Sequence, residues 1–183
     1  MKIVMAVTAL FLGVTVVAAM PTAKERMLSE AKISLPEAVA KAAPEAKDGS
    51  PVSARLKEEK GRIVYVVGVA QGETEIRFSM DAKTNELIGK TTVSRSHAKE
   101  LALAKVSVLK AVEAALKKVP GKATGVEMEI EKGKAIIEVK IFNEGKSWEV
   151  EVDAATGEVI EVEQDDDDGD DDEDDDDGDD KDD

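Results

Sequence analysis

The segment Asp153–Ile160 (DAATGEVI) decides how this chain is organised, because a close copy stands earlier in the chain at Asp81–Ile88 (DAKTNELI). Asp, Ala, Thr and Glu recur at the same spacing, and an apolar pair ends each copy. Strand-like runs lie on both sides of each copy, so each is predicted to be a hairpin turn. The Asp side chain of such a turn accepts hydrogen bonds from the backbone N–H groups that follow it.

Gly157 and Asn85 occupy the same position of the two copies. Both residue types tolerate a positive φ, as a type I turn followed by a G1 bulge requires. Two different residues suited to one conformation argue against a chance match. The repeat therefore predicts two similar units along the chain.

Helix and strand patterns repeat with the turns. Ser34 and Glu37 have capping-box spacing, and apolar residues follow at helical intervals. A second helix is predicted after Ser107, whereas residues 23–32 fit either a short helix or a frayed lead-in. Alternating strands are predicted around residues 52–57, 63–69, 76–80, 87–93, 126–130, 137–141, 148–152 and 160–162. Each unit is therefore α+β: one helix over an antiparallel sheet of three or four strands.

The N-terminus has the pattern of a secretory signal peptide. Lys2 precedes an apolar run, and small residues end at Ala19, after which cleavage is predicted; an uncleaved anchor is the alternative. Residues 1–19 are therefore assigned to a signal peptide and the protein to the periplasm or the medium, without stable membrane insertion after cleavage. The chain has no cysteine, which excludes disulfides and thiolate sites.

The acidic charge is concentrated at the C-terminus. The chain carries a formal net charge of −15, and residues 165–183 contain 15 Asp, one Glu and one Lys. Nucleic acid is excluded as a partner because its phosphates recruit basic residues. We expect residues 164–183 to be disordered. Their oxygen ligands favour Ca²⁺ or a similar hard cation, although no EF-hand spacing is present, and a solubilising role fits equally well.

A second acidic surface is expected on the sheet of the second unit. If its apolar residues face the helix, its glutamates share the opposite face. That face could be solvated, could dock onto the more basic face of the first unit, or could bind a cation. The predicted metal ligands on the sheet and tail are Glu127, Glu129, Glu138, Glu149, Glu151, Asp165, Asp166, Asp167, Asp168, Asp170, Asp171 and Asp172.

Catalytic motifs are not evident in the sequence. His97 is the single histidine, and its Lys/Ala-rich surroundings predict an exposed connector rather than a general base. We therefore expect a non-catalytic protein with no certain cofactor.

The chain resembles the PepSY domain in two consecutive copies, at residues 20–94 and 95–163. The resemblance rests on the Ala-Lys-Ile/Val-Ser helix entries, the Val-Pro-Gly helix end at 119–121 and the strand and turn at Trp148–Val159. The first copy departs from the pattern at Asn85 and lacks the Val-Pro-Gly end. The resemblance implies two cystatin-like units, each with one helix on a curled antiparallel sheet, and a secreted peptidase as a partner that such domains restrain.

Overall fold

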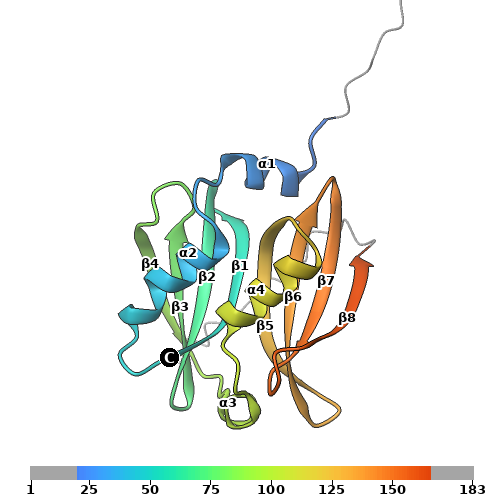
Figure 1. Cartoon of the computed structure of the whole chain (residues 1–183). Coiled ribbons are helices and arrows are strands. Elements are labelled where there is room, and N and C mark those ends of the chain that lie inside the picture. Colours follow the sequence, from blue (N-terminus) through green and yellow to red (C-terminus); the bar gives the residue numbers. More distant parts are fainter. Residues whose placement is uncertain (1–19, 166–183) are drawn as a thin grey trace, which may run out of the picture.

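The strands form one antiparallel sheet in a computed structural model that describes residues 20–165. The eight strands follow the order β4-β3-β2-β1-β5-β6-β7-β8 (Figure 1). Their bounds are β1 Ser50–Glu59, β2 Arg62–Gln71, β3 Thr74–Asp81, β4 Leu87–Val93, β5 Lys122–Glu131, β6 Lys134–Asn143, β7 Lys146–Asp153 and β8 Val159–Asp165. The α+β class and the antiparallel pairing predicted from the sequence are confirmed.

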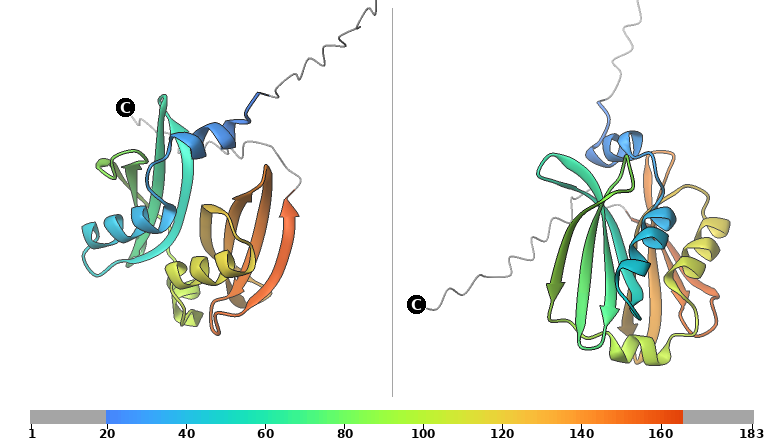
Figure 2. Two further views of the ribbon diagram at one scale, coloured as in Figure 1. Left: turned by 45° about the horizontal axis from the view of Figure 1, so that its top comes forward. Right: turned by 90° about the vertical axis from the view of Figure 1, so that its left-hand side faces the viewer.

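Helices cover one face of this sheet. They are α1 Ala23–Glu30, α2 Leu35–Ala42, α3 Ala98–Leu103 and α4 Val108–Lys118, with a short 3₁₀ turn, η1, at Ala43–Glu45. Figure 2 shows α2 and α4 lying side by side on the same face, whereas α1 and α3 lie at opposite ends of the strands. We call the face opposite α2 and α4 the outer face.

Local sequence explains where the helices begin. Thr22 and Ser34 each form a complete capping box with the glutamate three residues later, and the Ser107 hydroxyl accepts a hydrogen bond from the Lys110 amide. The lead-in that the sequence left open is therefore the helix α1.

The two halves of the chain join edge to edge. The first half, residues 23–93, contributes β1 to β4, and the second half, residues 98–165, contributes β5 to β8. Strands β1 and β5 pair where Ser53 faces Glu127 and Arg55 faces Gly125. The outer faces of both halves therefore look the same way. The alternative that the basic face of one unit docks onto the acidic face of the other is wrong, because one continuous sheet places them next to each other.

The core lies between the helices and the inner face of the sheet. The apolar residues predicted for the first helix are all buried, as are Val108, Ala111, Val112 and Ala115 of α4, whereas Leu116 is partly buried. Burying this apolar surface supplies the main stabilising term, at roughly 25 cal/mol per Å².

The prediction that the disordered tail begins at residue 164 is wrong for Gln164 and Asp165, because both belong to strand β8 and pair with β7. The signal peptide at 1–19 and the rest of the tail, from residue 166 onward, lie outside the described residues. Within residues 20–165, no helix combines the length and apolar character needed to cross a membrane.

Candidate functional site

Four glutamates form a continuous row across the outer face of the second half. Glu127 on β5 lies opposite Glu138 on β6. Glu138 also lies opposite Glu151 on β7, which in turn faces Glu161 on β8. We call these four residues the glutamate row. Side chains directly opposite each other across antiparallel strands have Cβ atoms about 5 Å apart, and like charges at that spacing destabilise a sheet.

Further carboxylates flank the glutamate row. Glu149 faces Glu163 across β7 and β8, and Glu129 lies near the end of β5. Lys140 is interleaved with them, opposite Glu149 in the register and with its Nζ atom 3.7 Å from Glu138 Oε1. The structure therefore gathers the five predicted sheet ligands on one surface.

Burial, together with the nearness of other carboxylates, raises the pKa of three of these carboxyl groups. Burial, then the nearby charge of Glu149, raises the pKa of Glu138 to about 7. Burial and the Glu127 charge raise the pKa of Glu129, and burial and the Glu131 charge raise that of Glu151. This surface therefore favours uptake of a positive charge, either a proton or a cation.

The carboxylates do not form a ready-made coordination shell. Within residues 20–165, no three Asp, Glu or His side chains converge closely enough to hold a metal ion. Asp165, another predicted ligand, ends β8 opposite Ser147. The remaining predicted ligands, Asp166, Asp167, Asp168, Asp170, Asp171 and Asp172, lie outside the described residues.

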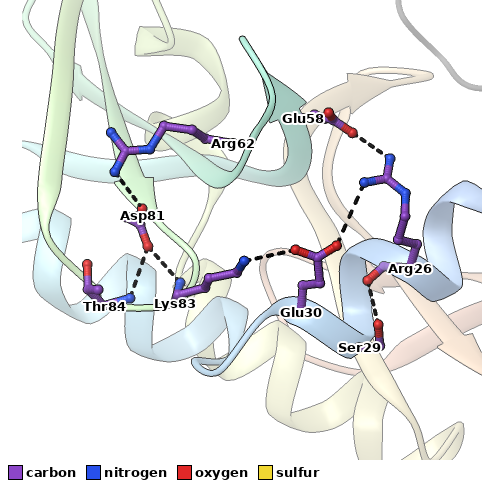
Figure 3. Close-up of polar contacts among 8 residues, drawn as sticks. All are labelled: Arg26, Ser29, Glu30, Glu58, Arg62, Asp81, Lys83 and Thr84. Atoms are coloured by element: carbon purple, nitrogen blue, oxygen red, sulfur yellow. Dashed lines mark hydrogen bonds and ion pairs between the residues drawn. The ribbon is translucent and has the colours of Figure 1, made fainter.

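The turn aspartates are structural, as the sequence predicted. Asp153 Oδ1 accepts hydrogen bonds from the amides of Ala155 and Thr156, at 2.9 and 2.8 Å. Asp81 does the same for Lys83 and Thr84, at 2.8 and 3.0 Å (Figure 3). These backbone hydrogen bonds are the main reason why the pKa of both carboxyl groups lies below the usual range.

The prediction that His97 is an exposed connector residue is wrong. Its side chain is only 1% exposed, and its Nε2 atom lies 2.8 Å from Glu75 Oε2. Glu75 Oε1 accepts a hydrogen bond at 3.1 Å from Arg77 Nε, and Glu75 Oε2 also lies 4.0 Å from Arg95 Nε. Arg95 reaches onward to Glu127, the first residue of the glutamate row, at 3.0 Å.

Glu75 is an ionised carboxylate in this network. Burial alone would raise its pKa, but hydrogen bonds from His97 and Arg77, together with their charges, outweigh burial and lower it. Gly68, in the middle of β2, leaves room for the group, since a Cβ at that position would lie 2.5 Å from Glu75 Oε1. A glycine inside an otherwise apolar strand was the signal in the sequence that could have indicated a group approaching there.

Helix α1 makes the corresponding contacts at the other end of the strands. Arg26 pairs with Glu58, and Glu30 accepts a hydrogen bond from Lys83 next to the Asp81 turn (Figure 3). Lys24 reaches the second half, where its Nζ atom donates to Ser147 Oγ at 2.8 Å. The chain before each half is thus tied to both halves.

These features define a class of protein: an α+β chain whose helices cover one face of a sheet and whose other face is strongly acidic in its second half. Residues 105–163 match the PepSY family model, described as "Peptidase propeptide and YPEB domain". The match begins at the entry to α4 and ends in β8.

Other comparisons give more distant similarity. No curated protein matches the chain. A crystal structure of a candidate lipoprotein from Clostridium difficile 630 is 20% identical and covers 76% of this chain and 97% of its own, with a TM-score of 0.46. The YpmB protein from Bacillus subtilis is also 20% identical and covers 70% of this chain and 96% of its own, with a TM-score of 0.33.

Proposed function

We propose that this chain is a non-catalytic, extracytoplasmic PepSY protein that binds hard cations, such as Ca²⁺ or a trivalent ion of similar size, through carboxylates of its second half. The glutamate row is the observation that carries the proposal. Three successive pairs of like charges face each other across β5 to β8. Like charges directly opposite each other destabilise a sheet, and a bound cation would offset that cost.

The chemistry of these ligands favours a hard ion. All of them are carboxylate oxygens, and the chain has no cysteine. Since no closed ligand shell exists among residues 20–165, the carboxylates would share ions that keep part of their water. Binding of this kind is weak and multivalent, and the acidic residues 166–183 would add further ligands of the same type.

A titration with Ca²⁺, followed by calorimetry, tests the proposal, with Tb³⁺ as a luminescent substitute. We expect saturable binding by the full chain, and affinity about tenfold weaker after the paired change Glu138→Gln and Glu151→Gln, because two of the four charges in the row are lost. Glu113→Gln, on the exposed side of α4, removes one charge from the helical face and is expected to leave binding unchanged.

A chain that ends at Asp165 separates the sheet from the tail. Saturable binding by this shorter chain supports the sheet as the site, whereas its loss would assign binding to residues 166–183. Absence of any saturable response in the full chain up to millimolar metal would overturn the proposal.

We also infer that the two halves are tandem copies of one PepSY-like, cystatin-like unit. The hydrogen bonds at the helix entries support this. The amides of Lys32 and Ile33 donate to the Ala82 carbonyl, and those of Lys105 and Val106 donate to the carbonyl of Ala154, the counterpart of Ala82 in the second turn. Separate expression of residues 20–94 and 95–165 tests whether either half folds alone.

A second candidate function is restraint of a secreted peptidase. The words "peptidase propeptide" in the description of the matching family favour it. Addition of the purified chain to peptidases secreted by the same cells is expected to slow one of them. Unchanged rates, and no peptidase recovered with the chain from the medium or periplasm, would remove this candidate.

A further inference from the structure

We propose that His97 is a protonation-dependent clasp that couples the two halves of the sheet. The clasp consists of His97 with Glu75, Arg77, Arg95 and Glu100. It does not depend on cation binding and would operate in a chain that binds no metal.

The position of His97 gives it this role. It lies directly before α3, which packs against β5 and β6 of the second half, and its imidazole contacts Glu75 on β3 of the first half. Both Glu75 and His97 are almost fully buried, at 1% exposure each. This side-chain contact therefore helps to tie the segment that leads into the second half to the sheet of the first.

The two nitrogens of the imidazole have different surroundings. Because Glu75 is ionised and can only accept, Nε2 carries the proton in the hydrogen bond between them. Nδ1 is buried and, in the described part of the chain, has no hydrogen-bond partner. The closest carboxylate oxygen, Glu100 Oε1, is 3.8 Å from Nδ1.

Protonation of His97 at Nδ1 would satisfy the nitrogen that lacks a hydrogen-bond partner. In neutral His97, a bare Nδ1 lone pair faces the Glu100 carboxylate and lacks a donor, which is costly for a buried polar atom. In the imidazolium, Nδ1–H points toward Glu100 while Nε2–H keeps its bond to Glu75. The charged groups around the pair are then Glu75 and Arg77 of β3, Arg95 of the connector, Glu100 of α3 and Glu127 of β5. With His97 protonated, these positive and negative charges balance.

The clasp therefore tightens on mild acidification and loosens as the imidazole loses its proton. Protonation of Glu75 sets the lowest pH at which the clasp holds. The pKa of Glu75 is lowered in the folded protein, so its stabilising charge is present above the ordinary glutamate value and is lost only when the pH falls through the lower, folded value.

The opposite end of the molecule provides an internal control. When the helix entries and the turns of the two halves are aligned, Lys24 and Ser147 occupy the positions that correspond to His97 and Glu75, and they also join the two halves. Histidine is the side chain whose charge ordinarily changes between pH 5 and 8. The contact made by α1 should therefore be insensitive to pH in that range.

Two measurements on the full chain test the clasp. Because the chain has one histidine, the imidazole NMR signals need no assignment and report directly whether Nδ1 becomes protonated. Hydrogen exchange, corrected for the intrinsic effect of pH, measures the attachment of residues 95–103 and of residues 22–30. From pH 5.5 to 8, protection of residues 95–103 is expected to fall about fivefold, as loss of one buried donor implies, and that of residues 22–30 to stay constant.

Substitutions separate titration from packing. His97→Gln retains an N–H donor toward Glu75 but cannot titrate, so protection of residues 95–103 should no longer depend on pH. Glu100→Gln, at a partly exposed position, should weaken the pH response even if His97→Gln does not fold. Constant protection of residues 95–103 in the natural chain, or an imidazole that titrates without any change in protection, would overturn the proposal.

Discussion

The outer faces of the two halves differ in charge at the same positions of the sheet. When Asp153 is aligned with Asp81, each of the five predicted sheet ligands of the second half has a counterpart in the first, and none of these counterparts is acidic. In the order Glu127, Glu129, Glu138, Glu149 and Glu151, the counterparts are Arg55, Lys57, Val66, Arg77 and Ser79.

The inner faces differ far less. Val67 corresponds to Val139, and Ala82 corresponds to Ala154, and all four are buried. Packing against a helix restricts the inner residues to apolar side chains of suitable volume, whereas the outer residues can differ in charge. The comparison teaches that the two halves share the residues of the inner face and differ in charge on the outer face.

The largest expected difference between the halves is the loss of stability when Glu75, rather than its counterpart Ser147, is replaced. We expect Glu75→Ala to lower the free energy of unfolding by about 3 kcal/mol, because it leaves His97 and Arg77 facing an empty buried position. Ser147→Ala removes one neutral acceptor and should cost about 1 kcal/mol. Urea denaturation at pH 7, followed by Trp148 fluorescence, measures both.

Acidification provides the check on this assignment. The stabilising charge of Glu75 is lost as the pH falls through its lowered, folded pKa, so the gap between the two variants should narrow in strong acid. A gap that stays constant down to low pH would mean that Glu75 acts by packing rather than by charge.

The second prediction concerns Glu138, which replaces the valine of the first half. Its pKa is raised to about 7, so the folded protein holds a proton that the unfolded chain releases near the ordinary value of 4.5. This contribution is complete below 4.5 and disappears as the pH rises through 7. Between pH 5 and 8, the free energy of unfolding of Glu138→Val should therefore rise by on the order of 1 kcal/mol relative to that of the natural chain.

The reverse exchange is the matched control. Val66 lies opposite Arg55 in the register, so the new carboxylate of Val66→Glu would have a positive neighbour instead of glutamates. The Val66→Glu variant should lose no stability, relative to the natural chain, between pH 5 and 8. If Glu138→Val and the natural chain respond identically to pH, the glutamate row does not impose the electrostatic cost assigned to it.

Features set by neighbouring residues were predictable from the sequence. The caps at Ser34 and Ser107 and the aspartate turns depend on groups within a few residues, so their spacing was sufficient. The shared face of the glutamates also followed, because alternation along a strand places every second side chain on one side.

Features set by long-range pairing were not predictable. Each half has two edge strands, and nothing local indicates that β1 and β5 pair and merge the sheets. The contact between Glu75 and His97 needs the register of β3 with its neighbours and the path of the connector. His97 therefore looked exposed because its sequence neighbours are polar, whereas its burial comes from residues distant in sequence.

The smallest predicted difference lies in the two turns, at Gly157 and Asn85. Both have positive φ, 80° and 59°, and a Cβ on Gly157 would lie 3.3 Å from the Val106 side chain. Gly157→Ala should cost about 1 kcal/mol, because alanine avoids this conformation. The free energy of unfolding of Asn85→Gly should stay within about 0.5 kcal/mol of that of the natural chain, because two effects oppose each other. Glycine adds flexibility to the unfolded chain, which destabilises the fold. The change also removes Asn85 Oδ1, which is buried without a hydrogen-bond partner among the described residues. Thermal unfolding of both variants measures the difference, and equal losses would show that the two turns are under the same backbone constraint despite their different residues.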